Sequence, residues 1–100
     1  MSNGFHVLVF FEAKPGKAEA LGRILADLIA PSRAEPACRY YQAFADRENA
    51  NRFTVIEAWA TPDDWQKHLQ ATHVANALEK LSTYDILVQP FTAQQLRAIG

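Results

Sequence analysis

The chain has 100 residues, of which 49% are hydrophobic and 21% are charged, and its formal net charge is −1. This length suits one hydrophobic core, so residues 1–100 are predicted to form a single domain. The near-neutral charge disfavours nucleic acid and anionic membranes as partners. The longest apolar run, Val7 to Phe11, is far shorter than the roughly 20 residues of a membrane-spanning helix. One cysteine, Cys38, cannot form an internal disulfide, and we expect a cytoplasmic protein.

The segment from Phe5 to Ala13 is predicted to be a β-strand with two apolar faces. Val7 and Val9 lie on one face, and Leu8 and Phe10 lie on the other. A strand of this kind is covered on both sides. If helices cover one side, a second copy of the chain is the candidate for the other, so we expect a homodimer.

An amphipathic helix is predicted to follow the break at Lys14-Pro15-Gly16. Its apolar residues recur at spacings of three and four: Ala18, Leu21, Ile24, Leu25, Leu28 and Ile29. Pro31 should end or kink this helix, because proline lacks the backbone donor and its ring clashes with the preceding turn. Residues 32–35 could then resume as a last helical turn.

Two strands in a hairpin are predicted next, over Cys38–Ala45 and from Asn51 to Trp59, joined by a polar turn. Thr61 and Pro62 then have the residue types of a helix cap and a first helical position. The helix is expected to run to about Ala71.

The second helix is predicted to break near Thr72 and to restart over His73–Leu81. A last strand is predicted over Tyr84–Phe91, and the tail from Thr92 is expected to form one helical turn or an arm that grips a partner. The order β-α-β-β-α-β indicates an α+β, ferredoxin-like antiparallel sheet with its helices on one face.

Glu57 is the first candidate for chemistry, because alternation along its strand places it among Phe53, Val55 and Trp59. A carboxylate in such surroundings must be hydrogen-bonded or have a raised pKa, which is how sites obtain acids and bases for neutral pH. The alternative is a structural ion pair with one of three nearby cations, Arg39, Arg52 or Lys67.

His68 and His73 are the candidate bases, because histidine titrates near neutral pH. They are five residues apart, or about 500° around an ideal helix, so on one continuous helix they would point in separate directions. They do not have the i, i+4 spacing of a metal pair, and we expect no metal site. The alternative is a surface His68 and a His73 that serves as a helix-start residue.

Aromatic side chains could line a pocket for a planar ligand or simply fill the core: Tyr40, Tyr41, Phe53, Trp59 and Trp65. The sequence has no glycine-rich phosphate loop, no GxSxG elbow and no CxxC pair. Phosphoryl transfer, nucleotide cofactors and serine hydrolysis therefore lose support.

Four segments carry a family resemblance: AKPGK at 13–17, SRAEPAC at 32–38, NRFTVIEAW at 51–59 and HLQATH at 68–73. Together they resemble the antibiotic biosynthesis monooxygenase family, especially its small quinol-monooxygenase-like members. The resemblance implies a dimeric α+β barrel in which two ferredoxin-like sheets face each other, with a pocket in each subunit between sheet and helices. Several members oxidise phenols or quinols with molecular oxygen and without metal, flavin or haem.

The resemblance also carries over to single positions. Trp59 matches a pocket tryptophan of the phenol-oxidising members, and Trp65 falls where they have a tyrosine. Val55 departs from them, since they have an asparagine there that holds the substrate. Val9 stands where the haem-degrading branch has an asparagine, and Leu78 lies near the position of its haem-ligating histidine, which argues against haem.

We therefore expect a cofactor-independent monooxygenase that oxidises a small aromatic phenol or quinol with molecular oxygen. His68 or His73 would be the base, and Glu57 would orient or tune it. Six residues would contact the substrate: Val9, Tyr40, Phe53, Val55, Trp59 and Trp65. The alternatives are a non-catalytic dimeric module that binds a hydrophobic metabolite, and an isomerase of a small oxygenated metabolite that consumes no oxygen.

Overall fold

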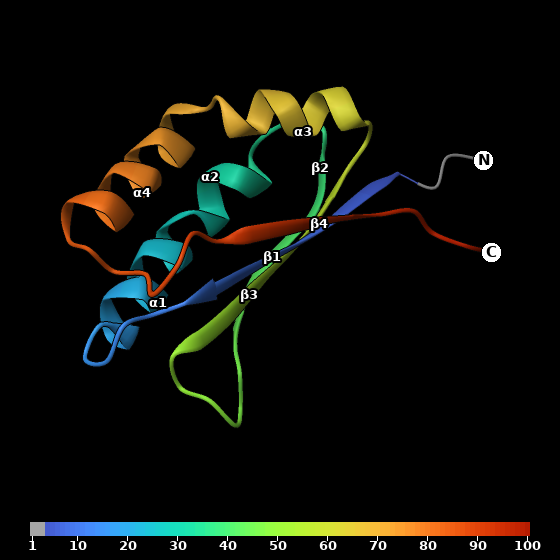
Figure 1. Ribbon diagram of the computed structural model, residues 1–100. Coiled ribbons are helices and arrows are strands. Elements are labelled where there is room, and N and C mark those ends of the chain that lie inside the picture. Colours follow the sequence, from blue (N-terminus) through green and yellow to red (C-terminus); the bar gives the residue numbers. More distant parts are fainter. Residues whose placement is uncertain (1–3) are drawn as a thin grey trace.

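The computed structural model describes residues 4–100, in which one four-stranded antiparallel sheet carries all the helices on one face (Figure 1). The strand order is β2-β3-β1-β4, which confirms the predicted ferredoxin-like α+β fold. The elements are β1 Phe5–Glu12, α1 Ala18–Asp27, α2 Ile29–Arg33, β2 Cys38–Ala45, β3 Arg52–Trp59, α3 Pro62–Leu69, α4 Thr72–Thr83 and β4 Thr92–Leu96.

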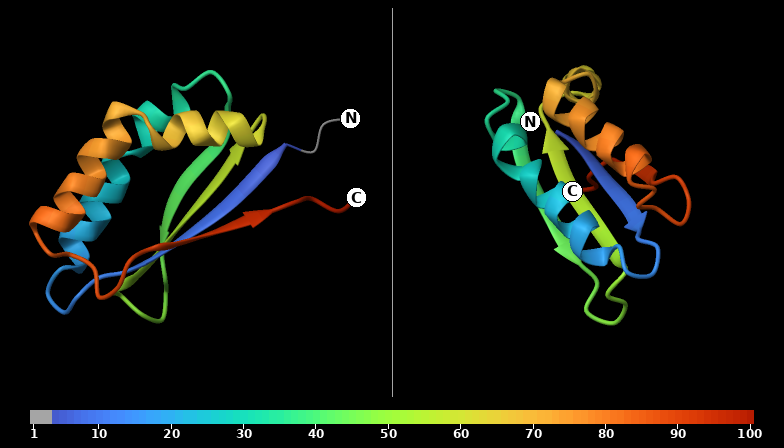
Figure 2. Two further views of the ribbon diagram at one scale, coloured as in Figure 1. Left: turned by 45° about the horizontal axis from the view of Figure 1, so that its top comes forward. Right: turned by 90° about the vertical axis from the view of Figure 1, so that its left-hand side faces the viewer.

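The first strand is central in the sheet, between β3 and β4. Val9 lies opposite Val55 on one side and Ala93 on the other. Its inward face is buried against the helices, whereas Phe10 on the outward face is exposed. The two apolar faces predicted for this strand are therefore present, and the helices cover one of them (Figure 2).

The break expected from Pro31 occurs just before it, between α1 and α2. Proline cannot donate a backbone hydrogen bond to the carbonyl of Asp27, which is the last residue of α1. Pro31 itself lies in the first turn of α2, where a backbone donor has no intrahelical partner in any case.

Capping also starts α3 as predicted. The Thr61 hydroxyl accepts a hydrogen bond from the backbone N–H of Asp64 at 3.2 Å, and Pro62 is the first helical residue. The helix ends at Leu69, and α4 begins at Thr72 after the two-residue break Gln70-Ala71. This break turns the chain, so α4 runs at an angle to α3 (Figure 2).

The prediction for the last strand is wrong. The strand is Thr92–Leu96, which pairs antiparallel with β1, and the tail therefore does not begin with a helical turn. The apolar run before it is a loop. Asp85 has a left-handed backbone (φ 51°), Ile86 is buried in the core, and Leu87 makes one isolated bridge to Ala13. The run before the strand is apolar because Ile86 is buried in the core. The polar segment Thr92–Leu96 forms the strand because it pairs with the free edge of β1.

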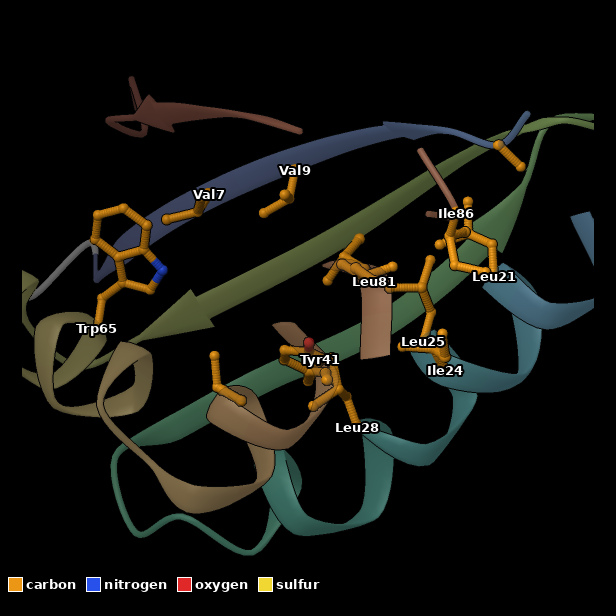
Figure 3. Close-up of a cluster of buried hydrophobic side chains, with 14 of the residues drawn as sticks. Val7, Val9, Leu21, Ile24, Leu25, Leu28, Tyr41, Trp65, Leu81 and Ile86 are labelled. Carbon is orange, nitrogen blue, oxygen red and sulfur yellow. The ribbon is translucent and has the colours of Figure 1, made fainter. Parts of the chain in front are cut away.

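The core lies between the sheet and the helices (Figure 3). Leu21 and Leu25 from α1 belong to one buried cluster with Val7 and Val9 from β1 and Leu81 from α4. Within residues 4–100, none of the helices has the length and apolar character needed to cross a membrane.

Candidate active site

A cavity of about 80 Å³ lies between the sheet and the helices. Its walls are mostly apolar and come from all four strands, from α1 and the residue after it, and from α3 and α4. They include Val9, Leu25, Leu28, Val55, Val74 and Leu81. Polar atoms enter from three titratable side chains, Tyr41, Glu57 and His68. A largely apolar cavity with a few converging polar groups is the usual form of a small-molecule site.

Glu57 projects from β3 into this cavity and is 4% exposed. Its Oε1 accepts a hydrogen bond from Trp59 Nε1 at 2.8 Å, a contact that follows from the i, i+2 spacing on one strand face. Burial raises the pKa of Glu57 to about 7; the Trp59 hydrogen bond opposes this rise, and the charge of Glu35 adds to it. Arg52, one of the cations expected as a structural partner, instead lies 3.7 Å from Glu12.

His68 on α3 is 2% exposed and lies between two carboxyl groups. Its Nδ1 is 2.7 Å from Glu35 Oε2, and its Nε2 is 3.8 Å from Glu57 Oε1. The Trp59 ring packs against the imidazole at a centroid distance of 4.5 Å. Burial lowers the pKa of His68, although the hydrogen bond to Glu35 opposes this effect.

The two carboxyl groups give the ring nitrogens of His68 different roles. An ionised Glu35 accepts the hydrogen that Nδ1 carries, which leaves Nε2 unprotonated on the side of Glu57 and the cavity. The lowered pKa keeps the imidazole neutral near pH 7. A neutral imidazole with a carboxylate behind it is the arrangement that general bases use in enzymes.

His73 also contacts Glu35, so the two histidines, which would diverge on one continuous helix, converge on the same carboxylate. Its Nε2 is 2.8 Å from the same Oε2 atom, because the break after α3 reorients the chain before His73. His73 does not line the cavity; it lines a separate surface depression between α1 and α4.

The cluster of Glu35, His68 and His73 has the donor types of a metal site. One ligand atom from each lies within 4.8 Å of the others, and it is the one such group among the described residues. The expectation of no metal was based on the absence of the i, i+4 histidine spacing, and the break between α3 and α4 brings the two histidines together without that spacing. In the cluster as it stands, Glu35 already binds both imidazoles at hydrogen-bond distance.

Sequence reasoning missed Glu35 and the role of Tyr41. Glu35 lies in the loop between α2 and β2, inside the SRAEPAC segment on which the family resemblance is based. Its place in that segment is the sequence feature that could have identified it. Tyr41 is buried on the inward face of β2, where its ring packs edge-on against the His68 ring at a centroid distance of 5.6 Å. Burial, followed by the charge of Glu57, raises its pKa.

The structure separates the aromatic residues expected to form one wall. Trp65 lines the cavity, and its buried Nε1 has no hydrogen-bond partner within residues 4–100. Its indole nitrogen faces the other core side chains (Figure 3). Trp59 lies fully buried behind Glu57 and His68 and supports them without lining the cavity.

Two of the expected contacts lie elsewhere. Tyr40 is 46% exposed on the outward face of the sheet, because an irregularity between Cys38 and Tyr40 sets the pairing so that Tyr41 faces inward. Phe53 packs beside Gly22 of α1 and lines a second, more polar depression. Val9 and Val55 line the cavity.

Fold and site together define a class of protein: a small ferredoxin-like α+β domain with an acid and a histidine in an apolar cavity beneath its helices. Residues 4–80 match the model of the family described as antibiotic biosynthesis monooxygenase. The chain belongs to the antibiotic biosynthesis monooxygenase family, as the resemblance indicated.

Solved structures of the same fold cover nearly the whole chain. PA3566 from Pseudomonas aeruginosa is 32% identical, with a TM-score of 0.91, over 100% of this chain and 98% of its own. Rv0793 from Mycobacterium tuberculosis is 22% identical, with a TM-score of 0.88, over 96% and 95%. A Nitrosomonas europaea protein described as a candidate antibiotic biosynthesis monooxygenase is 18% identical, with a TM-score of 0.91, over 99% and 93%. No curated protein matches the chain.

Proposed function

We propose that this protein is a cofactor-independent monooxygenase that oxidises a small phenol or quinol with molecular oxygen. The observation that carries the proposal is the convergence of Glu57 and a carboxylate-bound His68 on one apolar cavity. A base in a dry cavity can form an electron-rich phenolate, which is the species that reacts with oxygen.

In the proposed reaction, the substrate hydroxyl gives its proton to His68 Nε2, and the nearby Glu57 carboxylate stabilises the imidazolium. The phenolate passes one electron to oxygen, and the two radicals combine at a ring carbon to form a peroxide. The imidazolium returns its proton to the peroxide, and the neutral His68 then removes the ring proton while the O–O bond breaks. This leaves a ring C=O and a hydroxide, which takes up the ring proton to become water. A phenol with a free para C–H thus becomes a quinone, and a quinol becomes a hydroxyquinone, with one water formed per oxygen molecule.

Cavity size and polarity narrow the substrate class. The volume of about 80 Å³ is small beside the roughly 300–1,000 Å³ of typical ligand sites, which favours a single ring over a polycyclic substrate. Val55 cannot hold a substrate oxygen, whereas the unpartnered Trp65 Nε1–H can. We expect a monocyclic substrate with two oxygens, one at His68 and one at Trp65.

A homodimer is part of the proposal. The sheet face away from the helices exposes large apolar side chains from all four strands: Phe10, Tyr40, Phe44, Ile56 and Leu96. Exposed apolar patches of this kind mark protein interfaces. A second copy of the chain, packed sheet to sheet, would cover them.

Oxygen uptake tests the function. Protein dialysed against a chelator is mixed with monocyclic quinols and para-unsubstituted phenols, and oxygen consumption is compared with the spontaneous rate. We expect acceleration that survives chelation, because the proposed chemistry uses only the substrate, oxygen and side chains. Acceleration lost on chelation and restored by added metal would contradict the cofactor-independent reaction, and conversion without oxygen uptake would indicate an isomerase.

Exchange of His68 for glutamine assigns the base. Glutamine keeps a hydrogen-bonding group beside Glu35 but cannot accept the substrate proton, so kcat/KM should fall by about 10²–10⁴-fold. Lys67→Gln is the matched control, since Lys67 is the exposed neighbour on the same helix. Equal rates for His68→Gln and Lys67→Gln would remove His68 from the mechanism.

A further inference from the structure

Four titratable side chains form a continuous row from the cavity to the surface. Glu57 and His68 line the cavity, with Oε1 and Nε2 3.8 Å apart. His68 Nδ1 then meets Glu35 Oε2 at 2.7 Å, and the same oxygen meets His73 Nε2 at 2.8 Å. The side chains become more exposed along the row, from 3% for His68 to 20% for Glu35 and 23% for His73.

The outer end of this row opens away from the cavity. His73 lines a depression of about 150 Å³ between α1 and α4, together with Asp27, Asn76 and Lys80. The cavity and this depression share apolar residues of their common wall, Leu28 and Ala77, but His73 lines only the depression and His68 only the cavity. The row therefore crosses the wall between a buried apolar space and a polar surface.

We propose that Glu35 and His73 form a proton outlet, through which His68 exchanges protons with solvent at a surface separate from the cavity. The chemical identity of the group that supplies the proton rests on the proposed function, but the outlet itself rests on the row of contacts. Protons would then move without water entering the apolar cavity.

Each step is a proton transfer along an observed contact, and no electrons move. His68 takes a proton at Nε2 and releases one from Nδ1 to Glu35 Oε2, which returns the imidazole to a neutral form. His73, in the tautomer that carries its hydrogen on Nδ1, accepts the proton from Glu35 at Nε2 and releases the Nδ1 proton to water. Imidazole suits this task because it can bind a proton at one nitrogen while it loses another from the second. The same row runs inward when the reaction needs a proton returned.

Other charged and titratable groups on the neighbouring elements face the two histidines of this outlet. Tyr41 on β2 and Glu57 on β3 face His68. At the outer end, Asp27 on α1 and Lys80 on α4 share the depression with His73, one acid and one base. Neither side chain interrupts the contact between His73 and Glu35, because the His73 ring contacts Glu35 directly.

Hydrogen exchange at His68 tests the outlet without any substrate. In protein labelled with ¹⁵N-histidine, magnetisation transfer from water measures how fast the Nδ1–H of His68 exchanges with solvent. His73→Gln keeps an amide donor for Glu35 but cannot relay a proton, so exchange should slow about tenfold. Asn76→Ala, in the same depression, is the matched control and should leave the rate unchanged.

Further variants keep the test decisive. His73→Phe and Glu35→Gln should slow exchange as well, and added imidazole should restore much of the rate in His73→Ala, where space is opened. A protein spectrum that otherwise matches the wild type shows that each variant is folded. Unchanged exchange in the folded His73 variants, or slowing that is equal in Asn76→Ala, would overturn the proposal.

Turnover separates this inference from the proposed function. With an active substrate, His73→Gln should lose rate at low buffer concentration and regain it with imidazole, whereas His68→Gln should stay inactive in both conditions. If the wild type shows no oxygen uptake, the proposed function fails, and the exchange rates still decide whether the outlet exists. A His73→Gln variant with full turnover at low buffer would refute the outlet.

Discussion

The carboxyl group of Glu57 makes the stability of this protein depend on pH. Its pKa is about 7 in the folded chain against an ordinary value of 4.5, so the folded state binds more protons than the unfolded state between these values. Stability from this group is therefore full below about pH 4.5 and falls as pH rises to about 7. A shift of this size corresponds to about 3 kcal/mol.

Glu57→Gln removes this dependence and keeps an acceptor for Trp59 Nε1. We expect the variant to gain stability relative to the wild type between pH 5 and pH 8, by up to about 3 kcal/mol. The lowered pKa of His68 acts in the opposite direction, because it weakens the fold as pH falls, and comparison of the two proteins at each pH largely removes its contribution. Urea denaturation across this range measures the difference; a constant difference would show that burial does not perturb Glu57.

Trp65 is expected to act in binding rather than in the chemical step. Trp65→Phe keeps an aromatic ring in the cavity wall but removes the buried Nε1–H. The lost hydrogen bond should raise KM about threefold to tenfold with little change in kcat, since a neutral hydrogen bond contributes about 0.5–1.5 kcal/mol. Steady-state kinetics distinguish the two effects, and an unchanged KM would mean that the indole N–H makes no contact with the substrate.

Among the elements, α3 carries His68, the proposed base, and is stabilised by its N-terminal cap. The Thr61 hydroxyl accepts from the backbone N–H of Asp64 and also lies 2.7 Å from the Asp64 carboxylate. Thr61→Ala should cost about 1 kcal/mol in the free energy of unfolding, measured by chemical denaturation. Thr83→Ala, at the exposed end of α4, is the control and should change stability much less.

The break between α3 and α4 determines where the two histidine side chains lie. On one continuous helix, His68 and His73 would point in separate directions. The break at Gln70-Ala71 brings both imidazoles to Glu35, with His68 inside the cavity wall and His73 outside it. The sequence predicts a break near Thr72, but the arrangement of the two helices depends on tertiary contacts, of α3 with β3 and of α4 with α1.

At the scale of the whole molecule, the exposed sheet face predicts association. The double variant Phe10→Lys/Phe44→Lys would place two charges in an apolar sheet-to-sheet interface, where unpaired charges are costly. We expect this double variant to sediment as a monomer of about 11.2 kDa and the wild type at twice that mass. Tyr84→Lys alters an exposed residue outside the sheet and should stay dimeric. A monomeric wild type would contradict the homodimer.

Much of the fold could be predicted because its signals are local. Alternation along Phe5–Glu12 and Arg52–Trp59, the stripe of α1 and the cap at Thr61 each depend on residues close in sequence. The last strand was misplaced because its signal is not local. Thr92–Leu96 is polar and becomes a strand by pairing with the free edge of β1, while the apolar Ile86 fills the core from a loop.

The ferredoxin-like order of elements, the family and the position of Glu57 on a buried strand face all follow from the sequence alone. Tertiary structure decided the site: it excluded Tyr40 and Phe53 from the cavity, placed Trp59 behind it, and joined His68 and His73 through Glu35. The physical reason is distance along the chain. Strand faces and helix stripes repeat over a few residues, whereas Glu35 and His68 are 33 residues apart and meet only when the loop after α2 packs against α3.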